Sequence, residues 1–127
     1  MKTLGIDYGR SKVGLALGVA TFAEPMKVIR YSDTKILEEQ IRKVIEEEKI
    51  DKVVVGISEG SMETESKEFA DAIQPFISSK IEFYDETLTS KDAQRLSIEA
   101  GVPRKKRHQM EDAYAATIML QGYLDSN

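Results

Sequence analysis

The sequence has no cysteine and only three prolines among its 127 residues. Without cysteine there is no disulfide framework, no thiol nucleophile and no zinc site built on thiolates. No apolar run approaches the ~20 residues that a membrane-spanning helix requires, and the first residues do not resemble a signal peptide. We therefore expect a cytoplasmic protein without a membrane segment.

The composition is typical of a soluble globular protein, with 41% hydrophobic and 31% charged residues. A chain of 127 residues suits one domain, so we expect a single domain over residues 1–127. The 18 Lys and Arg residues against 22 Asp and Glu residues give a net charge of −4. Taken as an average, this charge predicts a mild aversion to nucleic acid.

The apolar pattern predicts an α/β fold. Period-two and β-branched runs predict strands over residues 4–9, 13–18, 26–31, 52–56 and 80–84. Helical spacing predicts helices over residues 35–48, 63–79, 89–101 and 111–124. Pro25 is expected to mark the start of the third strand, Pro75 disturbs the second helix, and Thr89 is the expected N-cap of the third. The order of elements indicates a mixed five-stranded sheet flanked by helices.

Acidic residues stand at the ends of several expected elements. Asp7 ends the first strand, Asp85 and Glu86 follow the fifth, and Asp112 opens the last expected helix. Carboxylates at the strand ends of an α/β sheet can converge in the crevice where such folds build their sites. Carboxylates brought together repel one another unless a cation neutralises them, and Mg²⁺ or Mn²⁺ is the natural partner for oxygen ligands.

Each acidic residue also has an ordinary structural explanation. Asp7 fits an Asx turn, Glu86 fits a solvated turn, and Asp112 fits a favourable charge at the positive end of a helix. The residues taken singly leave both interpretations open.

Several segments connect these positions. Residues 5–14 (GIDYGRSKVG), 54–56 (VVG), 85–89 (DETLT), 111–116 (EDAYAA) and 120–124 (LQGYL) together resemble the YqgF/RuvX family, in the right order and at fitting spacings. The resemblance implies an RNase H-like fold and divalent-metal nuclease chemistry, as in proteins described as Holliday junction resolvases and pre-16S rRNA nucleases. It also implies that Asp7, Glu86 and Asp112 are the catalytic acids and ligands of Mg²⁺ or Mn²⁺, with Asp85 as the substitute for Glu86.

Two segments depart from the family pattern. The family usually continues after the fourth strand with Leu-Pro and a glycine-containing loop, whereas residues 57–62 read ISEGSM and the loop is several residues shorter. Thr87 stands where the family has an arginine that could contact phosphate. These departures motivate a second hypothesis, that of a nucleic-acid-binding module without efficient cleavage.

Two basic segments are candidates for contact with nucleic acid. Backbone amides of the turn at residues 9–12, with Arg10 and Lys12, can form an anion-binding concavity beside Asp7, although an ordinary hairpin turn explains the glycine equally well. A basic loop ahead of Asp112 is expected to grip a phosphate backbone, against the alternative of a solvated loop. Its residues are Arg104, Lys105, Lys106 and Arg107.

The expected substrate follows from the resemblance and not from individual residues. The resemblance favours the precursor of 16S rRNA, with branched DNA as the alternative. A junction resolvase would need a homodimer to cut two strands. The motif around Asp7 also suggests the first phosphate loop of actin-like sugar kinases and ATPases. Those enzymes require two large lobes, for which 127 residues do not suffice.

Overall fold

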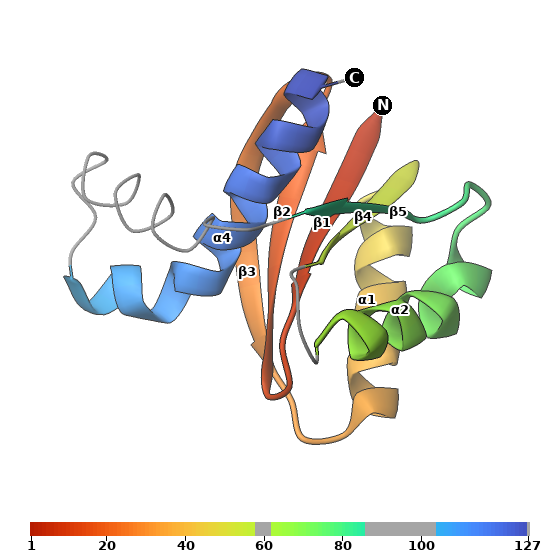
Figure 1. Ribbon diagram of the computed structural model, residues 1–127, viewed down its shortest axis with the longest axis horizontal. Coiled ribbons are helices and arrows are strands. Elements are labelled where there is room, and N and C mark those ends of the chain that lie inside the picture. The colour runs from red at the N-terminus through yellow and green to blue at the C-terminus, as the bar shows by residue number, and fades with distance from the viewer. Residues whose placement is uncertain (58–61, 86–103, 127) are drawn as a thin grey trace.

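The computed structural model describes residues 1–57, 62–85 and 104–126, and it contains a five-stranded mixed sheet in the order β3-β2-β1-β4-β5 (Figure 1). The central strand β1 pairs antiparallel with β2 and parallel with β4, while β3 and β5 form the two edges. The strands are β1 (Lys2–Tyr8), β2 (Lys12–Val19), β3 (Phe22–Arg30), β4 (Lys52–Ile57) and β5 (Glu82–Asp85). The predicted mixed sheet is therefore confirmed.

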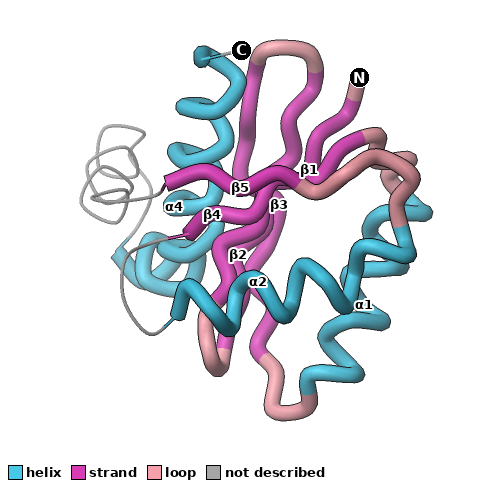
Figure 2. Tube along the Cα trace, turned by 45° about the vertical axis from the view of Figure 1, so that its right-hand side comes forward, coloured by secondary structure: helices cyan, strands magenta, loops and turns pink. Residues whose placement is uncertain are grey.

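Helices cover both faces of the sheet (Figure 2), which makes a three-layer α/β architecture. Two helices lie on one face and the long C-terminal helix lies on the other. They are α1 (Thr34–Glu47), α2 (Met62–Ile73), continued by the short 3₁₀ helix η1 (Gln74–Phe76), and α4 (Arg104–Ser126). The helix expected over residues 89–101, with its N-cap Thr89, lies outside the described residues. Among the described helices, none is long and apolar enough to cross a bilayer.

The face under α1 and α2 is built from large aliphatic side chains. Even-numbered residues of β1 and odd-numbered residues of β2 point to this face and pack against buried residues of both helices. The fully buried members of this core include Leu4, Ile6, Val13, Leu15, Leu37, Ile41, Val53, Val55 and Ile73. Helix α1 begins where the Asp33 carboxylate accepts a hydrogen bond from the Lys35 amide at 2.8 Å.

The face under α4 is built from small residues, which let the helix approach the strands closely. A Cβ on Gly5 would lie 2.9 Å from Cβ of Leu120, and one on Gly14 would lie 1.9 Å from the carbonyl oxygen of Asp112. Gln121 ties the helix to the β2–β3 hairpin, accepting from the Ala23 amide at 2.9 Å. Alternation along the strands therefore separates a bulky face from a face with little side-chain volume.

Two of the three prolines, Pro25 and Pro75, lie within described elements and act differently from each other. Pro25 was expected to precede the third strand, but it lies inside β3. An edge strand tolerates this because proline's missing N–H need not complete the ladder, and the register with β2 shifts beside it, between Leu15 and Ala16. Pro75 ends the regular part of α2, since the α-helix stops at Ile73 and a 3₁₀ turn follows.

Helix α4 is longer than the sequence predicts. It begins at Arg104 instead of Glu111, so two predictions are wrong: residues 104–107 form helix and not a loop, and Asp112 lies inside the helix and does not open it. The physical reason is that Pro103 can precede a helix start, and the arginines and lysines after it are strong helix formers. Figure 1 shows that the first part of α4 extends away from the sheet before the helix turns along it.

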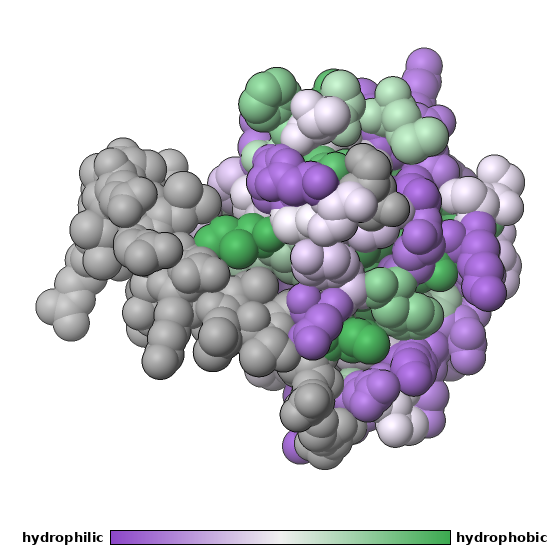
Figure 3. Space-filling view, turned by 45° about the horizontal axis from the view of Figure 1, so that its top comes forward, coloured by the Kyte–Doolittle hydropathy of each residue, from purple (hydrophilic) through white to green (hydrophobic). Residues whose placement is uncertain are grey.

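The part of the surface seen in Figure 3 mixes small groups of apolar side chains with hydrophilic ones. Among the residues with described side chains, the large apolar ones that are exposed are Met1, Val19, Phe22, Ile36 and Phe83. Single exposed apolar residues are ordinary on a soluble protein and by themselves indicate no binding surface.

Candidate active site

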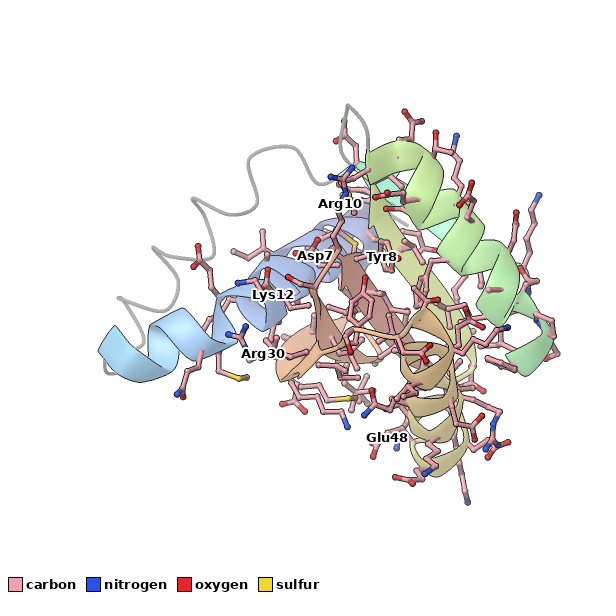
Figure 4. All side chains as sticks on the ribbon, turned by 90° about the horizontal axis from the view of Figure 1, so that it is seen from below. Asp7, Tyr8, Arg10, Lys12, Arg30 and Glu48 are labelled. Carbon is pink, nitrogen blue, oxygen red and sulfur yellow. The ribbon has the colours of Figure 1, made fainter. Side chains whose placement is uncertain are left out.

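Asp7 lies near the carboxyl end of the central strand. It pairs in register with Gly14 of β2 and with Gly56 of β4, so a glycine flanks it on both sides. Its odd position in β1 puts its partly buried side chain on the face covered by α4, whereas the next residue, Tyr8, points to the face of α1 and α2 (Figure 4). The expected placement of Asp7 at a strand end is confirmed.

Asp112 is brought to the same place by the contact between α4 and the sheet. The carbonyl oxygen of Asp112 touches the backbone of Gly14, where even a methyl group would not fit. Gly14 is the register partner of Asp7. The structure therefore places two of the predicted acidic residues next to the same glycine, one from the first strand and one from the last helix.

Lys12 places a positive charge beside the Asp112 carboxylate. It is two residues before Gly14 in β2 and leaves the sheet on the same face (Figure 4). Its Nζ lies 3.1 Å from Oδ2 of Asp112, and the two side chains are 38% and 26% exposed. Lys12 is therefore an ion-pair partner of a candidate metal ligand.

The turn between β1 and β2 is held in place from the other side. A Cβ on Gly9 would lie 2.7 Å from the Lys12 carbonyl oxygen, which explains the glycine. The Tyr31 hydroxyl donates a hydrogen bond to the Gly9 carbonyl, and the Arg10 Nε lies 3.1 Å from Oε2 of Glu65 in α2. Arg10 and Lys12 therefore engage carboxylates on opposite sides of the sheet; their contact with nucleic acid stays a prediction.

The third predicted acid belongs to the segment after β5. Asp85 is the exposed last residue of that strand and pairs with Ile57. The preceding residue, Tyr84, lies on the α4 face, where its ring meets the edge of Tyr123 at a centroid distance of 6.2 Å. By alternation, Asp85 lies on the opposite face from Tyr84. Glu86, like Thr87 and residues 58–61 of the shortened loop, lies outside the described residues.

Within the described ranges, no group of three acidic or histidine side chains is placed to hold a metal ion. The described part of the site is the pair Asp7 and Asp112. Carboxylate oxygens of this kind suit Mg²⁺ or Mn²⁺, and a third carboxylate would complete the predicted set.

The basic segment at residues 104–107 lies at the start of α4, on the part of the helix that extends away from the sheet (Figure 1). The first turn of α4 contains no acidic residue. Positive charges at a helix N-terminus oppose the helix dipole, so this end of the helix gains from a bound anion.

A pocket of about 380 Å³ lies on the opposite side of the sheet from Asp7. Its lining residues are Tyr8, Arg10, Tyr31, Thr34, Glu38, Glu65, Glu68, Phe69 and Ala72. Tyr8 stacks on Phe69 with ring centroids 4.6 Å apart, so it packs between the sheet and α2. Burial, helped by a hydrogen bond with Tyr8, raises the pKa of the Tyr31 phenol well above its ordinary value.

Sequence reasoning missed the residues that hold the site in shape. Gly14 admits Asp112, and Tyr31 and Glu65 anchor the turn. The recurrence of Gly14, Ala16 and Gly18 along one strand face was a usable signal for a closely packed helix. Nothing local to Glu65 indicates its partner, which is 55 residues away.

Comparisons with known proteins agree on one family and one fold. A family model described as RuvX, Holliday junction resolvase, matches residues 1–126. A protein of Oceanobacillus iheyensis named "Putative pre-16S rRNA nuclease" is 33% identical over 135 residues, which cover 98% of each chain. One with the same name from Clostridium botulinum (strain Hall) is 34% identical over 134 residues, with 99% of this chain and 98% of the relative covered.

Solved structures show the same architecture at low identity. RuvC of T. thermophilus, in complex with a Holliday junction substrate, superposes with a TM-score of 0.63 at 17% identity, covering 99% of this chain and 94% of RuvC. The Fowlpox virus resolvase, in complex with Holliday junction DNA, superposes with a TM-score of 0.67 at 13% identity, covering 99% of this chain and 98% of the resolvase. These similarities confirm the predicted RNase H-like fold.

Proposed function

Since the chain belongs to the RuvX family of Holliday junction resolvases, we propose that it is a metal-dependent endonuclease that hydrolyses phosphodiester bonds in structured nucleic acid. The observation that carries this proposal is the contact of Asp112 with Gly14, the register partner of Asp7. This contact places two acidic residues, one from the first strand and one from the last helix, beside the same glycine on one face of the sheet. Such an arrangement has a direct use in phosphodiester hydrolysis, because acidic groups held close together bind divalent cations.

We propose Asp7, Glu86 and Asp112 as the residues that hold Mg²⁺ or Mn²⁺. Asp85 lies on the face opposite Tyr84, away from the side of Asp7, which favours Glu86 as the third ligand and leaves Asp85 as the substitute. When bound, a divalent ion activates water and stabilises the leaving oxygen of the phosphodiester. The three carboxylates would hold the ion near the carboxyl end of β1.

Binding of the nucleic-acid backbone is assigned to cations around this site. Arg10 and Lys12 lie at the turn beside Asp7, and residues 104–107 form the start of α4. A phosphate backbone bound at that helix start would offset the unfavourable position of its positive charges. Segregation of charge explains how a chain with a net charge of −4 can bind a polyanion.

We propose the 5′ end of the 16S rRNA precursor as the substrate. The support is that relatives with 33% and 34% identity over nearly the full length of both chains carry the name of a pre-16S rRNA nuclease. A Holliday junction is the alternative substrate, favoured by the description of the family model. Cutting a junction symmetrically needs two active sites and hence a homodimer.

Cleavage of both substrates tests the proposal. Wild type, Asp7→Asn and Asp112→Asn are incubated with a precursor rRNA fragment and with a four-way DNA junction, in Mg²⁺ or Mn²⁺. Each substitution keeps the side-chain size and removes the charge. We expect each to reduce the cleavage rate by about 100-fold or more. Changing a residue that only hydrogen-bonds to a metal ligand already reduces activity by up to about 100-fold. The control is Asp71→Asn, which neutralises an exposed aspartate on α2.

The outcomes separate the alternatives. Variants that fold, bind and cleave at the wild-type rate would show that the carboxylate mechanism is wrong. Binding of both substrates by wild type without cleavage would favour the binding-module hypothesis. Cleavage of the junction alone, by a dimer, would identify the DNA substrate.

The basic start of α4 has its own test. Residues 104–107 are changed to glutamine, which removes the charge and preserves helix propensity. We expect weaker binding with a smaller salt dependence, because fewer counterions are released. A salt slope equal to that of wild type would contradict the proposed contact.

A further inference from the structure

Lys12 occupies an unusual place for a residue expected to bind phosphate. Its ammonium nitrogen lies 3.1 Å from a carboxylate oxygen of Asp112. Asp112 is one of the two described residues to which the proposed function assigns a divalent cation. A positive charge of the protein itself therefore already contacts an oxygen that a metal ion would need.

We propose that Lys12 is a built-in counter-ion that competes with the divalent metal for Asp112. In the metal-free protein the ammonium neutralises Asp112 and limits its repulsion of Asp7. When a metal takes the Asp112 oxygen, Lys12 is released and its ammonium becomes available to a substrate phosphate. Lys12 is thus a positioning residue whose role rests on the proposed function.

The geometry suits an exchange of this kind. The Lys12 side chain is 38% exposed, so the ammonium can leave Asp112 without crossing a packed core. Lysine carries a compact charge on a flexible stem, and its contacts are easily exchanged. Lys12 stands on the same strand face as Gly14, which is the register partner of Asp7, so the released ammonium stays beside the site.

The strength of the competition can be bounded. Half-exposed ion pairs of this kind are weak, and their typical strength corresponds to about a two- to fivefold effect on a competing equilibrium. The effect is large enough to measure and small enough for a metal at millimolar concentration to overcome.

Two substitutions at this position act in opposite directions. Lys12→Met keeps the length of the stem and removes the charge, which frees the Asp112 carboxylate. Lys12→Arg keeps the charge and adds a planar fork that grips carboxylates at two points. We expect Mn²⁺ to bind about two- to fivefold more tightly to Lys12→Met than to wild type, and more weakly to Lys12→Arg.

Arg10 provides the matched control. It stands in the same turn and forms an exposed ion pair at the same distance of 3.1 Å, but with Glu65 on the other side of the sheet. Arg10→Met removes a comparable ion pair without touching Asp112. We expect the affinity for Mn²⁺ to stay at the wild-type value.

The experiment measures Mn²⁺ binding to the intact chain by calorimetry, without nucleic acid. Tighter binding by Lys12→Met, with Arg10→Met unchanged and Asp112→Asn weakened, is the expected pattern. If wild type binds Mn²⁺ through Asp112 but Lys12→Met binds no more tightly, the counter-ion role is wrong and the proposed function stands. If neither wild type nor any variant binds Mn²⁺ or Mg²⁺, both the metal-dependent function and the counter-ion role are wrong.

Discussion

The two faces of the sheet differ in what their residues do. Under α1 and α2, branched aliphatic side chains such as Leu4, Ile6 and Val55 fill a continuous core. Under α4, Gly5 makes room for the Leu120 side chain, and Gly14 makes room for the backbone carbonyl of Asp112. The first face stabilises the fold by burying apolar area. The second sets the position of charged groups through contact with the backbone, which tolerates little adjustment.

The α4 face also carries charge at both ends of the sheet. At one end Lys12 pairs with Asp112. At the other end Lys52 pairs with Glu82, whose carboxylate also accepts a hydrogen bond from the Tyr123 hydroxyl at 2.7 Å. Only the first pair lies beside Asp7. The second fixes the C-terminal part of α4 against β5, so the comparison predicts a purely structural role for it.

The largest effect on stability is expected on the aliphatic face. Leu37→Ala removes a fully buried side chain of α1 and should lower the free energy of unfolding by about 2–5 kcal/mol, the usual cost of such a cavity. Denaturant unfolding measures it. Ile36→Ala is the control, because the Ile36 side chain is 59% exposed on the same helix. Equal losses for both variants would contradict the assignment of the core to this face.

Gly14→Ala tests the glycine face. Its Cβ would lie 1.9 Å from the Asp112 carbonyl oxygen, so α4 has to shift, at a cost of about 3 kcal/mol. We expect the variant to lose Mn²⁺ binding and cleavage even at temperatures where it remains folded. Calorimetry below the unfolding temperature measures the binding, and the nuclease assay measures the cleavage.

Gly18→Ala is the matched control for Gly14→Ala. Its Cβ would meet the flexible ends of the Leu120 and Leu124 side chains, each at 3.2 Å, and lie in ordinary contact with Cβ of Thr3 at 3.5 Å. We expect a smaller loss of stability and unchanged metal binding. If Gly14→Ala bound metal as well as Gly18→Ala, backbone contact would not be what positions Asp112.

The smallest effect concerns the ion pair at the far end of α4. Lys52, and after it the hydrogen bond from Tyr123, lowers the pKa of the Glu82 carboxyl below its ordinary value of 4.5. A lowered pKa in the folded state contributes stability that is present above pH 4.5 and is lost as the pH falls through the folded-state pKa. Because the Glu82 side chain is 42% exposed, solvent screening keeps the contribution below about 1 kcal/mol.

We therefore expect Tyr123→Phe to lower stability at pH 7 slightly and to flatten the loss of stability as the pH falls below 4.5. Thermal unfolding across this pH range measures the difference. Cleavage by Tyr123→Phe should equal that of wild type. A reduced cleavage rate would mean that both ends of the α4 face serve the site.

Local patterns predicted most of the fold because the strands and α1 have clear periodicities. The observed α1 (Thr34–Glu47) differs by one residue at each end from the expected range. The errors have local causes as well. Glycine and proline in residues 101–103 favoured a loop continuing to Glu111, whereas α4 begins at Arg104. Pro25 is tolerated in β3 because the strand lies at the sheet edge, which local sequence does not reveal.

The site was less predictable than the fold. Asp7 and Asp112 each had an ordinary structural explanation, and only the family resemblance linked them. Their meeting depends on Gly14, a residue with no side chain, in a contact between segments remote in sequence. The partners of Arg10 and Lys12 are equally remote. Pairings of this kind depend on tertiary packing and leave no periodic signal in the chain.

The contact between β1 and α4 has a consequence for the time at which the protein becomes active. Asp112 is translated 105 positions after Asp7. Since domains fold during synthesis from the N-terminal end, the β1–β2 hairpin can form while α4 does not yet exist. A nascent chain without α4 lacks Asp112 and therefore has no complete site. On the proposed function, cleavage of nucleic acid has to wait until α4 has been made.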